Sequence, residues 1–164
     1  MTEASLVYPV EGKYVWLMEK QQKIGVGRLN GLGGKWEPGD RDIEATMLRE
    51  AYEEGRILPT IYRKMAKIAF HNPSDDETLR HMLVHMWVAT GWKGKLKSTN
   101  EMKKPARFEI DKNLPVKNMM SGDHLFIKEI LTGQAMHGVI VFNDDWSLNE
   151  KLSHVGVASE EDLI

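Results

Sequence analysis

The sequence of 164 residues contains no cysteine. Disulfide bonds, thiolate nucleophiles and cysteine-based zinc sites are therefore excluded. No apolar run approaches the roughly 18 residues that a membrane span needs, and the first residues lack the basic and apolar regions of a signal peptide. With a net charge of −2, the chain has no excess of lysine and arginine for electrostatic binding to nucleic acid or to an anionic membrane. We therefore expect a cytoplasmic protein with no membrane partner and no stable nucleic-acid partner.

Internal repeats and low-complexity segments are also missing, and the six histidines show no H-x-x-E-H or H-E-x-x-H spacing. What the chain does have is 41% apolar and 28% charged residues, which suits one compact domain with a substantial core. We expect a single domain over residues 1–164.

Hydrophobic periodicity predicts strands and helices in a mixed order. Alternation of apolar and polar residues predicts strands over residues 5–8, 13–19, 61–70 and 79–90, and near 106–110. Residues 121–133 have helical spacing, and residues 137–155 are typical of a hairpin that turns at the NDD stretch. The order predicts an α/β or α+β sandwich and no regular βαβ repeat.

The clearest helix is predicted over residues 42–55. Ile43, Met47 and Ala51 recur every fourth residue, Asp42 is a favoured N-cap, and Gly55 stands where the helix should stop. Ahead of this helix, residues 28–40 read RLNGLGGKWEPGD, which we interpret as a glycine-rich loop that lets another group come close.

Three glutamates fall within five positions of the predicted helix. Glu50 and Glu54 project from one face, and Glu53 lies close beside them. Such like charges are favoured where a divalent cation such as Mg²⁺ sits over them, although a solvated helix face is the commoner meaning of this pattern. The glycine-rich loop favours the metal-site interpretation, because it can offer carbonyls to a metal and N–H groups to a phosphate, with Lys35 and Arg49 nearby.

Residues 33–57, GGKWEPGDRDIEATMLREAYEEGRI, resemble the Nudix box, usually written G-x5-E-x7-R-E-U-x-E-E-x-G-U with U an aliphatic residue. The core REAYEE matches, and Asp40 stands where the first glutamate of the box is expected. One extra residue before Arg49 should lengthen the loop ahead of the helix. The closing glycine, Gly55, comes one position early, which should alter only the end of the helix. The sequence is thus identified as a member of the Nudix hydrolase superfamily.

The stretches GRLNGLGGK, NEMKKPARFEI, LPVKNMMSGDHLFIKEIL and HGVIVFNDD are similar to the 8-oxo-dGTP diphosphatase subfamily, which includes MutT and MutX. The resemblance implies a Nudix-type α/β/α sandwich with a mixed central sheet and the loop-helix-loop of the box. It also implies that Mg²⁺, with Mn²⁺ as a substitute, is held by the carbonyl of Gly33 and the carboxylates of Glu50, Glu53, Glu54 and Glu101.

The same resemblance implies a pocket for a purine base. Asn30 would contact the base, and Asp123 would read the purine edge. Gly122 stands in place of a second aspartate, Met120 in place of a stacking tryptophan, and Ile24 in place of a phenylalanine. The residues alone allow other roles, since Asn30 suits a turn and Asp123 suits a helix N-cap.

Apolar side chains would complete this base pocket. Phe70, Met82 and Met120 are the candidates, because a polarizable thioether or an aromatic ring can pack against a purine face. The alternative for the methionines, with Met86 among them, is that they fill the core.

The expected reaction is Mg²⁺-dependent hydrolysis of a small-molecule nucleotide, 8-oxo-dGTP or a related oxidised purine nucleoside triphosphate, to the monophosphate and pyrophosphate. Glu53 or Glu101 would act as general base, Arg49 would hold the glutamates through Asp40 or Glu53, and Lys35 would reach a phosphate. Two alternatives stay open: a Nudix pyrophosphatase for a nucleotide sugar, dinucleoside polyphosphate or capped RNA, and a non-catalytic nucleotide-binding module. The protein is expected as a monomer or a homodimer.

Overall fold

A computed structural model describes every residue from Met1 to Ile164. Its strands are β1 (Thr2–Glu11), β2 (Tyr14–Lys20), β3 (Leu29–Asn30), β4 (Leu32–Lys35), β5 (Leu58–His71), β6 (His81–Lys93), β7 (Met102–Glu109), β8 (Met136–Val141) and β9 (His154–Val157). Its α-helices are α1 (Ile43–Gly55), α2 (Glu77–Arg80) and α3 (Ile127–Leu131), and short 3-10 turns span Val116–Asn118, Asp123–Leu125 and Glu161–Leu163.

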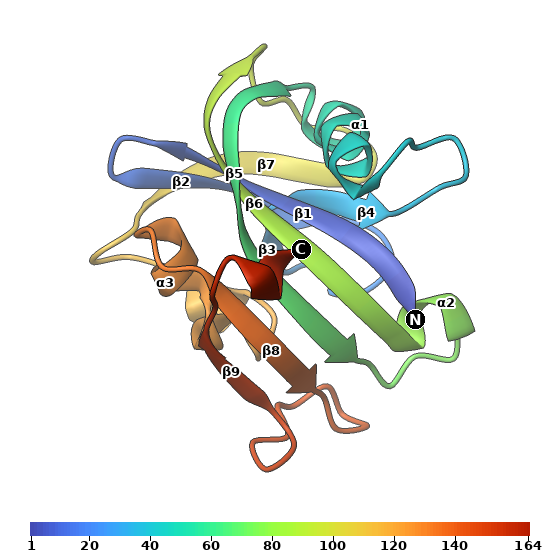
Figure 1. Cartoon of the computed structure of the whole chain (residues 1–164). Coiled ribbons are helices and arrows are strands. Elements are labelled where there is room, and N and C mark those ends of the chain that lie inside the picture. The colour runs from blue at the N-terminus through green and yellow to red at the C-terminus, as the bar shows by residue number, and fades with distance from the viewer.

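The strands form one mixed sheet with the order β3-β2-β1-β6-β5-β8-β9, while β4 pairs with β1 and β7 pairs with β2 (Figure 1). β1 runs parallel to β6, and β5 runs antiparallel to β6 and parallel to β8. The mixed sheet and the few helices confirm the predicted α+β class.

The two faces of the sheet carry separate hydrophobic clusters. Successive side chains of a strand point to opposite faces, so Val7 packs with α1 and its neighbour Tyr8 packs with α3. Met86 and Trp87 of β6 divide between the two clusters in the same way. The helices α1 and α3 therefore cover opposite faces (Figure 1).

The ends of α1 depend on Asp42 and on the residue after Gly55. Asp42 caps the helix as predicted, because its side chain accepts a hydrogen bond of 2.8 Å from the Ala45 N–H. At the other end Arg56, and not Gly55, adopts the left-handed conformation with φ of 62°, and its N–H donates to the Tyr52 carbonyl. Gly55 is small for a different reason: a Cβ there would lie 2.7 Å from Cδ1 of buried Leu32.

Replacing Arg56 with glycine should stabilise the protein, since glycine adopts a positive φ without the steric cost of a Cβ. We expect the free energy of unfolding to rise by about 0.5 to 1 kcal/mol in urea denaturation. The matched control is Gly55→Ala, which should destabilise by about 1 to 3 kcal/mol because its methyl group meets Leu32. Equal effects of the two variants would contradict this division of roles.

Three local predictions were wrong. The glycine-rich segment 28–40 is not all loop, because Gly33 and Gly34 lie in β4, where a Cβ on Gly33 would come 1.9 Å from the Ser5 carbonyl oxygen of β1. The helix expected over 121–133 is broken at Phe126, whose φ of −143° ends the 3-10 turn before α3 begins. The strand expected over 79–90 begins only at His81, because Leu79 and Arg80 belong to the short helix α2.

The predicted C-terminal hairpin is present, and β8 pairs antiparallel with β9. The expected turn at NDD is present and is closed by an antiparallel bridge between Phe142 and Leu148. The whole connection, from residue 142 to residue 153, is longer than that turn alone.

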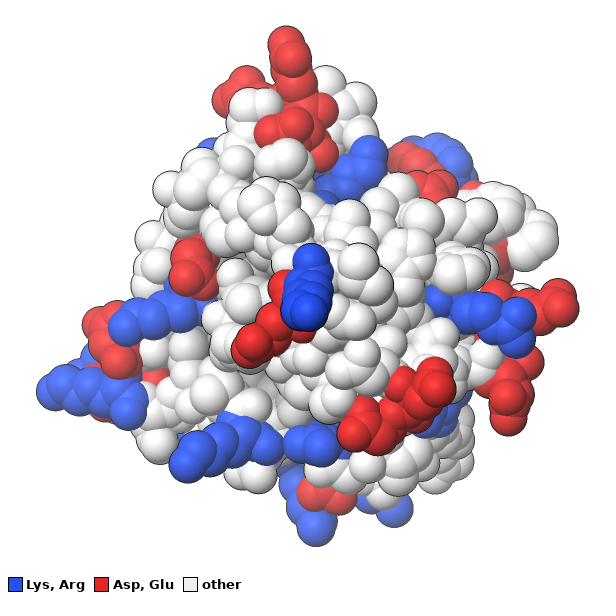
Figure 2. Space-filling model, turned by 90° about the horizontal axis from the view of Figure 1, so that it is seen from below, with Lys and Arg blue, Asp and Glu red and all other residues white.

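The helices are too short and polar to include a candidate membrane span. On the face seen in Figure 2, basic and acidic side chains are interspersed, and the lysines and arginines do not gather into a continuous patch.

Candidate active site

Three carboxylates converge beside the C-terminal half of α1. The side chains of Glu50, Glu54 and Glu101 each offer an oxygen, and these oxygens lie within 4.8 Å of one another. Glu50 and Glu54 are only 6% exposed, and their spacing of four residues places them on one face of the helix. We call these three residues the acid group.

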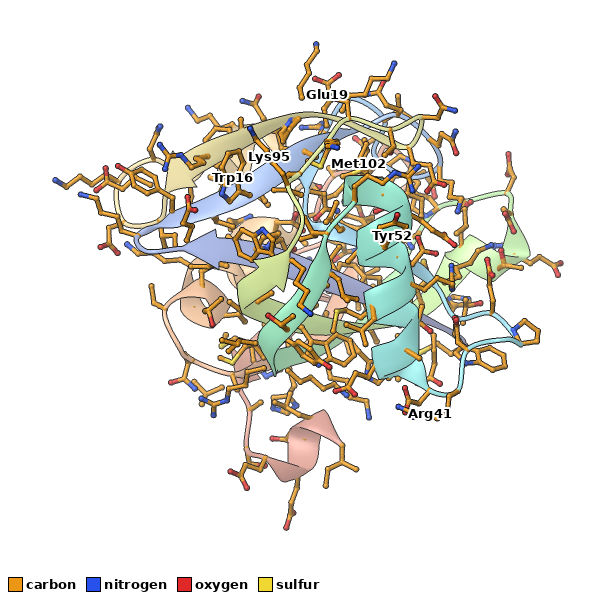
Figure 3. The ribbon with its side chains drawn as sticks, turned by 90° about the horizontal axis from the view of Figure 1, so that it is seen from above. Trp16, Glu19, Arg41, Tyr52, Lys95 and Met102 are labelled. Carbon is orange, nitrogen blue, oxygen red and sulfur yellow. The ribbon has the colours of Figure 1, made fainter.

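Glu101 reaches the acid group because the start of β7 lies against α1. Met102 is buried beside the C-terminal end of α1 (Figure 3), in the same hydrophobic cluster as Ala51. The Thr99 hydroxyl donates to the Glu54 carbonyl at 2.9 Å, which ties the loop before β7 to the helix. Residues almost fifty positions apart are thereby held together.

The acid group is electrostatically unfavourable by itself. Burial raises the pKa of Glu50, and it raises the pKa of Glu54 to about 8, against a 2.8 Å hydrogen bond from the Gly33 N–H that favours the ionised form. Buried carboxylates that repel one another are relieved by protons or by a cation. Clustered carboxylate oxygens are the donor set that Mg²⁺ and Mn²⁺ prefer, so the residues present fit a divalent cation.

Arg49 hydrogen-bonds to Glu50 of the acid group and to neighbouring carboxylates. Its Nε and Nη2 donate to the two Asp40 oxygens, both at 2.8 Å, and its Nη1 lies 2.9 Å from Glu50 Oε1 and 3.1 Å from Glu53 Oε2. Nη2 also donates to the Lys35 carbonyl at 3.2 Å. The Arg49 guanidinium holds the pKa of Asp40 well below its usual range. The predicted pairing of Arg49 with Asp40 and Glu53 is thus present.

Glu53 itself lies outside the acid group. Its side chain is 47% exposed and lies 3.1 Å from Arg49. Glu53 is the neighbour of Glu54 in sequence, but its carboxylate is not among the three that converge. The remaining expected ligand, Gly33, lines the same cavity as Glu54 and faces it through its N–H.

One cavity extends from the acid group into the face of the sheet that α3 covers. Of the 24 residues that line it, 11 are hydrophobic. Glu54, Glu101, Lys20 and Lys35 are among the polar lining, and the apolar lining includes Phe70, Met82, Met120 and Ile24. A ligand with a flat apolar ring at one end and negative charge at the other suits this lining.

Asn30 and Asp123 line the same cavity, away from α1. Asp123 is 4% exposed, and burial raises its pKa to about 7. The alternative in which Asp123 caps a helix is wrong: its side chain makes no capping hydrogen bond, and the 3-10 turn begins after Gly122. Its Oδ2 is buried without a hydrogen-bond partner. A buried polar atom left unpaired at a cavity wall is a candidate contact for a ligand.

A family model described as NUDIX domain matches residues 3–129. The chain belongs to the Nudix family. Two curated relatives are each named oxidized purine nucleoside triphosphate hydrolase. The one from Danio rerio is 31% identical over 152 residues, covering 92% of this chain and 94% of the relative. The one from Mus musculus is 29% identical over 140 residues, covering 85% and 86%.

The Nudix fold is also seen in a solved structure, a MutT protein from Bacillus halodurans. It superposes with a TM-score of 0.72 and covers 96% of this chain and 97% of that chain, at 17% identity. At that identity the likeness concerns the fold, which here is a Nudix hydrolase fold.

In this Nudix hydrolase the box runs from β4 through the loop 36–42 and along α1. The extra residue of the box falls between Asp40 and Arg49, and the Asp40–Arg49 ion pair still forms at 2.8 Å. The loop and the first turn of α1 therefore absorb the insertion without displacing Arg49 from its partner.

Lys20 and Tyr8 are among the polar residues of the Nudix site that sequence analysis missed. Lys20 lines the cavity at the end of β2, where burial lowers its pKa and Glu54 and Glu101 oppose that shift. Tyr8 lies fully buried below Asn30. The available signals were a lysine closing an apolar strand and a tyrosine within SLVYPV, and neither signal is specific.

Proposed function

We propose that this Nudix hydrolase converts oxidised purine nucleoside triphosphates, with 8-oxo-dGTP as the representative, into the nucleoside monophosphate and pyrophosphate. The observation that carries the proposal is the single cavity that joins the acid group to Asn30 and Asp123. The printed names of the two curated relatives support the same substrate class.

At the phosphate end, Glu50, Glu54 and Glu101 would hold Mg²⁺, with the carbonyl of Gly33 as a further oxygen ligand. Bound there, the ion supplies positive charge that offsets the phosphate oxygens and makes phosphorus more electrophilic. Lys20 lies near Glu54 and Glu101, and Lys35 also lines the cavity with its ammonium 3.0 Å from the Thr78 hydroxyl; both would pair with phosphate oxygens. Arg49 keeps Glu50 and Glu53 oriented through its contacts with both carboxylates.

Two carboxylates are candidates to take the proton of the attacking water. Glu101 lines the cavity, and Glu53 adjoins the acid group with one oxygen held by Arg49. The base would also have to act at near-neutral pH. Comparing kcat of Glu53→Gln with that of Glu101→Gln across pH 6 to 9 would identify the base, since its loss removes the limb of the profile that the base produces.

At the base end, Phe70, Met82 and Met120 would pack on the ring, while Asn30 and Asp123 would bond its edge. Ile24 occupies part of the rim. Gly122 cannot carry a second acid without rearrangement, because a Cβ there would lie 2.8 Å from Cγ2 of Ile140. Asp123 would therefore be the one acidic side chain of this pair to contact the base edge.

The test is a hydrolysis screen with Mg²⁺ over 8-oxo-dGTP, dGTP, dCTP, ADP-ribose, a diadenosine polyphosphate and capped RNA. We expect the highest kcat/KM for 8-oxo-dGTP, with monophosphate and pyrophosphate as products. A higher kcat/KM for ADP-ribose, the dinucleotide or capped RNA would overturn the proposed substrate class. No turnover of any of them would point to a binding module.

Asp123→Asn should erode the preference for guanine-type triphosphates over dCTP. The asparagine amide adds a donor where the base presents donors, and an unpaired buried group costs roughly 1 to 3 kcal/mol, so the kcat/KM ratio should fall about 5- to 150-fold. Because burial raises the pKa of Asp123 to about 7, its acceptor form accumulates as pH rises through 7. The wild-type ratio should therefore rise from pH 6 to pH 8, and the ratio in the variant should stay flat.

The control for that experiment is Asp111→Asn, an exposed acid in the turn after β7. It should keep both the substrate ranking and its pH dependence. An unchanged ranking in Asp123→Asn would remove Asp123 from base recognition.

A further inference from the structure

A buried tyrosine hydroxyl lies beside the base-reading asparagine. Tyr8 of β1 is fully buried, and its hydroxyl donates to Asn30 Oδ1 at 3.4 Å. The backbone N–H of Gly31 donates to the same oxygen at 2.8 Å. One amide oxygen thus accepts from two different segments, strand β1 and the connection between β3 and β4.

The backbone at Gly31 makes this double contact possible. A Cβ on Gly31 would lie 2.5 Å from the Val7 carbonyl oxygen and 3.0 Å from Cδ1 of Tyr8. Because Gly31 has no side chain, the backbone between β3 and β4 can pack directly against the Tyr8 ring. The Gly31 N–H and the Tyr8 hydroxyl therefore meet at the same side chain.

The two contacts determine which half of the Asn30 amide faces the cavity. An amide oxygen accepts two hydrogen bonds, and both are used, so the Nδ2 group with its two N–H donors remains for a ligand. A flipped amide would set Nδ2 against the Gly31 N–H, which can only donate. Burial and the nearby Asp123 raise the pKa of Tyr8, so its hydroxyl keeps the proton that it donates.

We propose that Tyr8 is a positioning residue for base recognition: with the Gly31 N–H, its hydroxyl fixes the Asn30 amide so that the cavity offers an N–H donor together with the Asp123 carboxyl, and so selects a 6-oxopurine edge. A 6-oxopurine with a 2-amino group presents an acceptor followed by donors, which complements that pair. A cytosine edge presents the opposite polarity, with a donor where the amide needs an acceptor. This proposal rests on the proposed function.

The test measures kcat/KM for 8-oxo-dGTP, dGTP and dCTP with Mg²⁺ in wild type, Tyr8→Phe, Asn30→Ala and the double variant. Phenylalanine keeps the buried ring and removes only the hydroxyl. We expect the guanine-to-cytosine ratio to fall about 3- to 10-fold in Tyr8→Phe, the size expected for losing one neutral hydrogen bond. In the Asn30→Ala background the same change should have no further effect on the ratio, because Tyr8 acts through Asn30.

A merely structural role would give another pattern. If Tyr8→Phe lowered the ratio equally in both backgrounds, or left it unchanged in the wild-type background, the proposal would be overturned. Tyr14→Phe on β2 is the matched control, since its half-exposed hydroxyl makes no hydrogen bond in this structure and its loss should leave the ratio unchanged.

Asn30→Asp gives a second, independent measurement should Tyr8→Phe fold poorly. Aspartate keeps the oxygen that Tyr8 and Gly31 contact but replaces the Nδ2 donor by an acceptor, so the preference for guanine should collapse. A retained preference would overturn the assigned amide orientation. These outcomes are separate from a failure of the proposed function, in which wild type would prefer ADP-ribose, the dinucleotide or capped RNA, or would cleave none of the substrates.

Discussion

Glu54→Gln is expected to lower kcat on the preferred triphosphate on the order of 10³-fold at saturating Mg²⁺. Glutamine keeps the length of the side chain and an oxygen for the 2.8 Å hydrogen bond from Gly33, but it removes the negative charge from the acid group. Because Glu54 is buried and its pKa is raised to about 8, a neutral side chain should not destabilise the metal-free fold. Rapid-quench kinetics and a thermal melt in EDTA check the two expectations.

The control for this loss is Glu44→Gln in the first turn of the same helix. It removes the same charge from α1 at a site that is not part of the acid group. Its kcat should stay near the wild-type value. Wild-type turnover in Glu54→Gln would contradict the assignment of the acid group as the metal site.

The second large effect is expected for Arg49→Lys. The guanidinium makes five contacts, two of them bidentate to Asp40, whereas an ammonium group keeps the charge but cannot span both Asp40 and Glu50. Loss of this bracing should reduce kcat about 10- to 100-fold, as found for residues that orient metal ligands. KM should change little if Arg49 acts only through the protein groups that it contacts.

Arg41→Lys is the matched control for Arg49. Arg41 lies at the N-terminal end of α1 (Figure 3), and its ion pair with Asp42 is exposed, so kcat and KM should both be unchanged. A large rise in KM with unchanged kcat in Arg49→Lys would instead place Arg49 on a phosphate.

The predictions that held depended on local signals. The start of α1 was predictable because Asp42 binds the Ala45 N–H within a single turn, and the ion pair of Asp40 with Arg49 spans only nine residues. Strand alternation in β6 likewise placed Met82, Val84 and Met86 on one face, where all three line the cavity. Each of these features is decided by neighbours in sequence.

The features that escaped prediction depend on contacts between distant segments. The sequence places Gly33 and Gly34 in a loop, but in the fold both lie in β4. There Gly33 allows close approach to Ser5 of β1, and Gly34 leaves room for the Glu50 carboxylate. Tyr8 and Lys20 become part of the site only because β1 and β2 lie beneath it. Nothing within SLVYPV distinguishes a tyrosine that supports Asn30 from one that fills the core.

The position of the acid group along α1 has a consequence for the helix itself. The peptide dipoles of a helix leave partial negative charge at its C-terminal end. Glu54 lies in the last turn of α1 with Glu50 one turn before it, and that last turn contains no basic residue. The helix thus ends with its own macrodipole and its carboxylates acting in the same unfavourable direction. The Arg56 guanidinium donates to the Tyr52 carbonyl at this helix end, at 3.4 Å. A divalent cation bound to the acid group would add positive charge at the carboxylates themselves, so it would also stabilise the last turn of α1.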